Sequence, residues 1–211
     1  MASEVSLSSA KTLDAAPEVE DALVARCRQG DPDAFAGLVS RYEGMVYGLA
    51  SRLLGDPEEA RDVAQEVFLQ VFRALDRFEG RSRIKTWIYR IAVNQCRNRR
   101  RFWRRRVLAH ARPIESMTAQ EEARASSEHS LAEDPFASVA RRERAARVQA
   151  ALARLSFDHR AILLLRESDG LTGEEIAAAL GIAEGTVKSR LARARDAFRL
   201  CLEREPGEET P

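Results

Sequence analysis

Apolar side chains recur at the spacing of an α-helix through most of this sequence, and that pattern limits the possible folds more than any other feature. No segment shows convincing alternation of apolar and polar residues with the period of two that a half-buried strand requires. The periodic segments are also punctuated by helix start and stop signals. The sequence therefore predicts an all-α protein.

Two similar start signals mark the first block of helices. Asp31-Pro32 and Asp56-Pro57 each place an Asp at the N-cap and a Pro at the first helical position. Glu59 stands where a Glu can complete a capping box with Asp56. Gly30 and Gly55 each follow a helix as a stop. We expect helices over residues 19–29, 32–54, 57–75 and 84–103, with a loop over 76–83.

The third of these helices has an apolar face and a polar face. The apolar stripe, which we expect in the core, comprises Ala60, Val63, Ala64, Val67, Phe68, Val71 and Phe72. The other face carries Arg61, Asp62, Gln65, Glu66 and Gln70. Such a polar face is either an interaction surface or a plain solvated surface. In the fourth helix, Trp87 lies at helical spacing with Ile88 and Ile91, so we expect it in the core rather than stacked on a base.

Residues 174–191 have the pattern of a helix-turn-helix. Thr172 and Glu175 form a capping box for its first helix, and Gly181 lies in the turn, where it can take a positive φ. The second helix, expected from about residue 184 to 202, exposes Thr186, Lys188, Ser189, Arg190, Arg193 and Arg195. A basic helix of this kind fits the major groove of DNA. The alternative, which involves no DNA binding, is an amphipathic helical hairpin with a solvated basic face.

Between the two helical blocks, the periodicity breaks over residues 107–140. This segment contains two prolines and Ser-rich stretches, and its 34 residues are too many for an ordinary loop. We interpret it as a flexible interdomain linker between two small helical domains, at residues 20–106 and 141–203. Residues 1–19 are small, polar and aperiodic, which predicts a disordered arm, and residues 204–211 form a tail.

The net charge of +1 conceals strong segregation along the chain. Residues 20–106 carry a net charge of +6, whereas the predicted linker carries −4. Seven of the ten residues from 97 to 106 are Arg, which indicates phosphate contacts, with simple solubility as the alternative. Phe102 and Trp103 interrupt this Arg run and favour an interaction surface, either for nucleic acid or for the second domain.

Several classes of protein are excluded by what the sequence lacks. There is no GxSxG motif, P-loop, HExxH motif or Cys/His cluster, so we expect no enzyme activity, no catalytic residues, no metal site and no cofactor. The three cysteines are widely spaced and predict no disulfide framework. No apolar run is long enough for a membrane helix, and residues 1–16 do not resemble a secretory signal. We therefore expect a cytoplasmic protein without direct membrane insertion.

Three segments together resemble bacterial sigma-70 family RNA polymerase sigma factors, and more narrowly the extracytoplasmic-function (group IV) class. They are residues 62–68 (DVAQEVF), 86–94 (TWIYRIAVN) and 185–191 (GTVKSRL). The resemblance covers about residues 20–106 and 141–203. It implies that the first domain is sigma region 2, which binds core polymerase and melts the −10 element. It implies that the second is region 4, which reads the −35 element.

The resemblance also implies roles for particular residues. The core-polymerase-binding residues would be Asp62, Gln65, Glu66, Phe68 and Leu69. The −10 DNA-binding residues would be Lys85, Arg90, Asn94 and Arg97. The −35 DNA-binding residues would be Thr186, Lys188, Ser189, Arg190, Ala192 and Arg193.

The implied partners are core RNA polymerase, through its β′ and β subunits, promoter DNA, and an anti-sigma factor. The alternative function is a stand-alone helix-turn-helix transcriptional regulator, which would bind duplex promoter DNA without polymerase. A structural adaptor is a further alternative, but it leaves the basic recognition helix unexplained.

Overall fold

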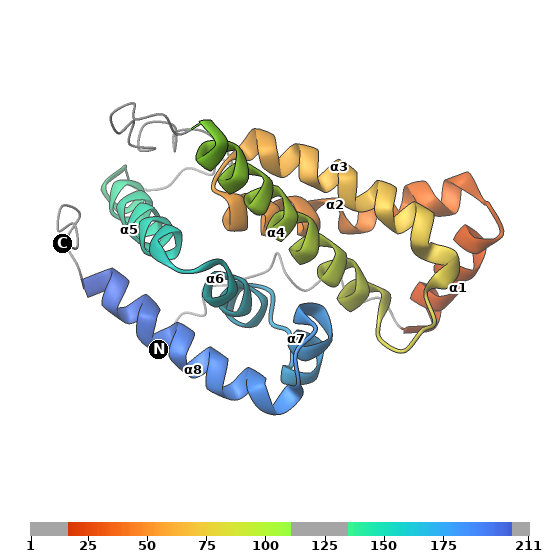
Figure 1. Cartoon of the computed structure of the whole chain (residues 1–211). Coiled ribbons are helices and arrows are strands. Elements are labelled where there is room, and N and C mark those ends of the chain that lie inside the picture. Colours follow the sequence, from red (N-terminus) through yellow and green to blue (C-terminus); the bar gives the residue numbers. More distant parts are fainter. Residues whose placement is uncertain (1–16, 111–134, 204–211) are drawn as a thin grey trace.

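The computed structural model describes residues 17–110 and 135–203, and within these ranges all regular secondary structure is helical. The all-α prediction is therefore confirmed. The predicted tail, most of the predicted linker and nearly all of the predicted N-terminal arm lie outside the described residues. Figure 1 shows two groups of helices side by side, which we call the N-terminal bundle (α1–α4) and the C-terminal bundle (α5–α8).

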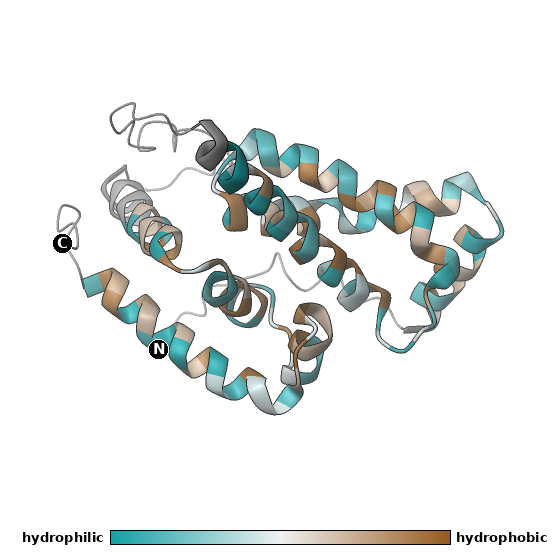
Figure 2. Ribbon diagram, in the orientation of Figure 1, coloured by the Kyte–Doolittle hydropathy of each residue, from teal (hydrophilic) through white to brown (hydrophobic). Residues whose placement is uncertain are grey.

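The N-terminal bundle forms where the sequence signals predict it. Its helices are α1 (Pro17–Arg28), α2 (Pro32–Leu54), α3 (Pro57–Ala74) and α4 (Ile84–His110), with a short 3-10 turn η2 (Leu75–Arg77). The carboxylates of Asp31 and Asp56 cap α2 and α3 by accepting from backbone amides two and three residues ahead, at 2.9–3.1 Å. Gly55 ends α2 with a φ of 78°. Apolar positions recur on one face of each helix, as Figure 2 shows, and pack together in the core.

Glu59 does not complete the capping box predicted for α3. Its carboxylate lies instead 2.9 Å from Nη1 of Arg99 on α4. Asp56 alone caps the amides of Glu58 and Glu59. The Glu59 side chain is only 20% exposed, and a partly buried carboxylate gains more from a charged guanidinium on a neighbouring helix than from a backbone amide.

The C-terminal bundle contains the predicted helix-turn-helix. Its helices are α5 (Pro135–Arg154), α6 (Phe157–Leu163), α7 (Gly173–Leu180) and α8 (Glu184–Glu203), with a π-helical turn η3 (Leu164–Ser168) after α6. The capping box of Thr172 and Glu175 is present at the start of α7, and Gly181 ends α7 with a φ of 66°. The helix-turn-helix prediction is confirmed in α7 and α8.

Helices extend into both ends of the segment predicted as a linker. The structure continues α4 to His110, beyond the expected end near residue 103, because nothing before Pro113 breaks the helix. It also starts α5 at Pro135, since Pro is favoured at the first helical position. The segment between the two bundles is therefore shorter than the sequence indicates.

The two bundles are in direct contact. The largest contact between them joins α4 to α7 (Figure 1). Helix α2 also contacts α6. Buried apolar residues of both bundles form one connected core. Among the described residues, no helix combines the length and the apolar character needed to span a membrane.

The burial of Cys96 gives a test of the core. Cys96 lies on α4 and is fully buried, and burial raises the pKa of its thiol to about 12, whereas Cys201 on α8 is half-buried. We expect iodoacetamide at about pH 8 to modify Cys201 in the native protein and to leave Cys96 unmodified until denaturant is added. Mass spectrometry of tryptic peptides measures both sites. Equal rates of modification at Cys96 and Cys201 would contradict this packing.

Candidate functional site

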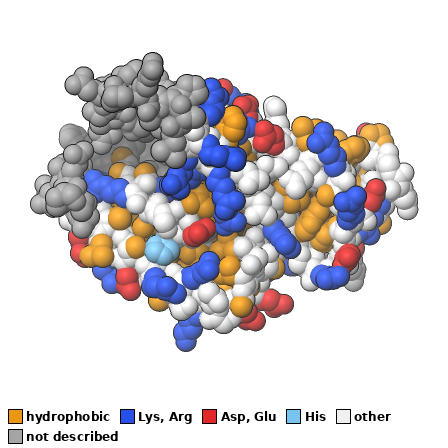
Figure 3. Space-filling view, viewed as in Figure 1, with side chains coloured by type: hydrophobic (Ala, Val, Ile, Leu, Met, Phe, Trp, Pro, Cys, Tyr) orange, Lys and Arg blue, Asp and Glu red, His pale blue; other side chains and the backbone are white. Residues whose placement is uncertain are grey.

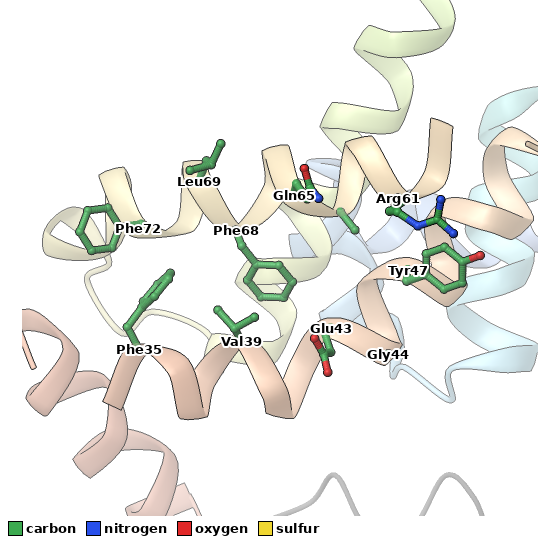
Figure 4. A pocket seen from close by; sticks show the side chains of 11 residues that line it. Phe35, Val39, Glu43, Gly44, Tyr47, Arg61, Gln65, Phe68, Leu69 and Phe72 are labelled. Carbon is green, nitrogen blue, oxygen red and sulfur yellow. The ribbon is translucent and has the colours of Figure 1, made fainter. Parts of the chain in front are cut away.

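An apolar groove runs between α2 and α3. It has a volume of about 770 Å³. Its lining is shown in Figure 4 and comprises Phe35, Val39, Glu43, Gly44, Tyr47, Arg61, Ala64, Gln65, Phe68, Leu69 and Phe72. In that view Phe68 points toward α2, whereas Leu69 points away from it. Leu69 and Phe72 are 55% and 65% exposed, so the groove presents large apolar side chains to solvent.

The structure brings most of the predicted core-binding residues to this groove. Gln65, Phe68 and Leu69 line it. Asp62 is exposed on the same helix, α3. Glu66 lies on the far side of Leu69, in a second hollow that Leu69 also lines. Leu69 therefore forms a ridge between two concave surfaces.

Phe35 and Phe72 extend this surface, although the sequence pattern placed Phe72 in the core. Their rings lie 5.1 Å apart in an edge-to-face arrangement at one end of the groove. The apolar stripe predicted for α3 covers about half of the helix circumference, well beyond the roughly 100° that faces a core. The width of the stripe therefore indicates that one of its edges, which includes Phe72, stays exposed.

The predicted −10 residues lie along α4. Arg90 and Asn94 are exposed, whereas Lys85 and Arg97 are half-buried. Arg90 and Asn94 share their face with three further exposed residues at helical spacing, namely Asn98, Arg101 and Arg105. Figure 3 shows Lys and Arg side chains grouped along the path of α4.

The Arg residues at the end of α4 differ in exposure and in their contacts. Arg99 is only 19% exposed and forms ion pairs with Glu59 at 2.9 Å and Glu66 at 2.6 Å. These contacts tie α4 to α3, so Arg99 holds the bundle together rather than facing a phosphate. Arg97 donates to Oδ1 of Asn94 at 3.2 Å and also pairs with Asp158 of α6 in the C-terminal bundle at 3.2 Å. The remaining Arg residues of the run are exposed.

Phe102 and Trp103 are partly exposed near the end of α4. The two residues are 47% and 42% exposed, and the guanidinium of Arg106 lies 5.6 Å and 5.5 Å from the two ring centroids. The pair therefore forms an aromatic and cationic surface facing solvent.

The predicted −35 residues gather on α8. Lys188, Ser189, Ala192 and Arg193 are exposed, whereas Thr186 and Arg190 are half-buried. Local hydrogen bonds order this face: the Ser189 hydroxyl donates to the Thr186 carbonyl at 3.0 Å, and Nε of Arg193 donates to the Ser189 carbonyl at 3.3 Å. Arg195, in contrast, pairs with Glu167 of η3 at 2.6 Å. The opposite face of α8 buries Val187, Leu191 and Ala194.

Comparisons with protein families match both bundles. The family described as "Sigma-70 region 2" matches residues 38–106, and the family described as "Sigma-70, region 4" matches residues 145–198. The two matches occur in the order in which the sequence motifs predicted them.

Individual relatives match over nearly the whole chain. The RNA polymerase sigma-H factor of Pseudomonas aeruginosa is 38% identical over 88% of this chain and 95% of its own length. The ECF RNA polymerase sigma-E factor of Escherichia coli is 39% identical over 85% of this chain and 92% of its own length.

Two solved structures are similar in fold. The structure of CnrH in complex with the cytosolic domain of CnrY matches with a TM-score of 0.61 and 26% identity, covering 87% of this chain and 97% of that chain. The sigma factor RpoE of Bartonella quintana, solved in complex with the anti-sigma factor NepR, matches with a TM-score of 0.61 and 25% identity, covering 82% and 98%.

The two ion pairs of Arg99, with Glu59 and Glu66, lead to a prediction about stability. We expect Arg99→Ala to lower the free energy of unfolding by about 1–2 kcal/mol, because it leaves Glu59 and Glu66 without their shared partner. Arg61→Ala is the matched control, since Arg61 pairs with Glu58 on the exposed face of α3. We expect that control to unfold like the wild type in urea. An equal free energy of unfolding for Arg99→Ala and wild type would show that these ion pairs do not stabilise the N-terminal bundle.

Proposed function

Since this chain belongs to the sigma-70 family of RNA polymerase sigma factors, in its extracytoplasmic-function class, we propose that it binds core RNA polymerase and directs promoter-specific transcription initiation. The main support for this function is that region 2 and region 4 both match in one chain. The similarity to the sigma-H factor covers 88% of this chain and 95% of that protein. A stand-alone helix-turn-helix regulator has no use for the N-terminal bundle. The sigma-factor function therefore replaces that alternative.

We assign the promoter and polymerase contacts to separate surfaces. The groove between α2 and α3, with Leu69 as its ridge, exposes the apolar side chains that mark a protein–protein interaction site, and we assign it to core polymerase through the β′ subunit. The exposed face of α4 is assigned to the −10 element, where Asn94 can donate to and accept from a base edge. The exposed face of α8 is assigned to the major groove of the −35 element.

The remaining assignments follow from this function. RNA synthesis belongs to polymerase, so we assign no catalytic step to this chain. We place the protein in the cytoplasm, where core polymerase and promoter DNA are found. The similar solved sigma factor RpoE is bound to an anti-sigma factor, and we propose that a protein of that kind also holds this chain inactive.

Transcription in vitro tests the function directly. Core RNA polymerase would be incubated with the purified chain and genomic DNA of the source organism, and the RNA 5′ ends would be sequenced. We expect start sites that share sequence elements near −10 and −35 and that are absent without the chain. No such start sites, together with sequence-specific footprints from the free protein, would instead establish a stand-alone regulator.

The ridge of the groove provides a second test. We expect Leu69→Ala to weaken binding to core polymerase about tenfold, because truncation of one of the few residues that anchor a protein interface costs more than about 1 kcal/mol. Fluorescence anisotropy with labelled protein measures the affinity. Leu200→Ala is the matched control, since Leu200 is also exposed but lies on α8. Equal affinities of the two variants would remove the groove from the polymerase interface.

The recognition helix provides a third test. We expect Arg193→Ala to reduce holoenzyme transcription from a mapped promoter by roughly 5- to 100-fold, as loss of a major-groove contact does. Arg199→Ala is the control, because Arg199 is exposed on the same helix and pairs with Asp196. The defect should disappear on a promoter whose activity does not depend on its −35 element. A defect of the same size in Arg199→Ala would point to general charge rather than to base reading.

A further inference from the structure

Arg28, the last residue of α1, contacts the segment that leads into α4. Its Nε donates to the Leu75 carbonyl at 3.3 Å, and its Nη2 donates to the Phe78 carbonyl. The Leu75 carbonyl also accepts from the Phe78 amide at 3.0 Å, which closes the 3-10 turn η2. Hydrogen bonds from a charged donor are the stronger ones, so Arg28 holds both ends of this turn.

The Phe78 side chain connects this contact to α4. Phe78 is 7% exposed, and the Arg28 guanidinium lies 6.0 Å from the centroid of its ring. The ring centroids of Phe78 and Trp87 are 5.1 Å apart in a tilted arrangement. Contacts between a guanidinium and a ring, and between two rings, are attractive at these distances. Arg28, Phe78 and Trp87 thus form a continuous series of contacts from α1 to the first turn of α4.

The first turn of α4 needs support from outside the helix. It contains no acidic residue, although a carboxylate there would stabilise the positive end of the helix. It contains Lys85 instead, whose positive charge is unfavourable at that end. Lys85 is one of the residues assigned to the −10 element, and a DNA phosphate beside it would supply the missing negative charge. The turn is therefore better suited to binding DNA than to its own stability.

Arg28 can position this turn because α1 is itself held on α2. Val24 of α1 is buried in the core. Glu20 is only 6% exposed, and its carboxylate accepts a hydrogen bond from the Tyr42 hydroxyl of α2 at 2.6 Å. These two contacts fix the helix from whose end the Arg28 side chain extends.

The proposed −10 residues lie on the side of α4 that Trp87 begins. Arg90 and Asn94 follow Trp87 by three and seven residues, which places them one and two turns further along that side of the helix. A displacement of the first turn at Trp87 therefore moves Lys85 and rotates the face that carries Arg90 and Asn94.

We propose that Arg28 is a positioning residue for −10 recognition. It holds η2 and Phe78 so that the first turn of α4 presents Lys85 and the Arg90 face to the melted strand in one arrangement. Arg28 acts through Phe78 and Trp87 and needs no contact with DNA itself. The match to sigma-70 region 2 begins at residue 38, beyond the end of α1, so it assigns no role to this residue. This inference rests on the proposed function.

Hydrogen exchange of the free protein tests the structural part of the proposal. Because Arg28→Ala loses both hydrogen bonds to η2, we expect amide exchange at least about fivefold faster in peptides covering residues 75–88. Peptides from α2 and α8 should exchange at wild-type rates. Arg26→Ala is the matched control, since Arg26 lies on the same helix and pairs with Asp31 at 2.7 Å. Equal exchange of residues 75–88 in the two variants would overturn the proposal, whatever the function of the chain.

Binding of holoenzyme to melted promoter DNA tests the functional part. Two fluorescent probes would each carry the mapped −35 duplex and a single-stranded −10 region, with either the mapped or a scrambled −10 sequence. We expect Arg28→Ala to lower the preference for the mapped sequence at least about fivefold, because a well-placed contact to a base contributes this much discrimination. Arg28→Lys keeps the charge and one donor, so it should recover most of the preference. Affinity for core polymerase should match wild type in both variants.

The outcomes separate the positioning role from the proposed function. A wild-type holoenzyme that prefers the mapped probe, with an equal preference in Arg28→Ala, would overturn the positioning role alone. Equal losses of affinity for core polymerase and for both probes would show a general structural defect and would also overturn it. A wild-type holoenzyme that does not distinguish the probes contradicts the proposed −10 assignment and the positioning role together.

Discussion

The packing of α4 is the constraint on which the rest of the structure depends. One face of this helix must bury Ile88, Ala92 and Cys96 against α2 and α3, and another meets α7. The exposed remainder, with Arg90 and Asn94, is all that stays open to a ligand. The position of the proposed −10 surface therefore follows from the burial of the other faces, since a helix can present to solvent only what its neighbours leave uncovered.

Features encoded within a few residues could be predicted from the sequence, and features that depend on distant neighbours could not. The caps at Asp31, Asp56 and Thr172 and the stop at Gly181 are local, because donor and acceptor lie within one helical turn. The role of Glu59 depended on Arg99, forty residues away in the chain, and no local pattern marks that partner.

The same limit applied to the candidate site. The motifs of α3, α4 and α8 identified the helices that carry the proposed functional faces. They did not show that Phe72 stays exposed, because its burial depends on how far α2 covers α3. The sequence motifs also did not distinguish the Arg residues at the end of α4 from one another. The structure separates Arg99, which pairs within the bundle, from Arg101 and Arg105, which face solvent.

Two kinds of surface in this chain suit two kinds of association. The groove beside Leu69 and Phe72 exposes apolar area that stays unfavourable in water until a protein covers it, which favours a durable complex. The contact between the bundles instead combines apolar side chains, which form one connected core, with two buried charges, Asp169 of the loop after η3 and Arg160 of α6. Desolvation offsets much of the attraction between such charges, so the buried apolar side chains contribute most of the stability of this contact. The groove therefore stays available to a protein partner, whereas the contact between the bundles is already satisfied within the chain.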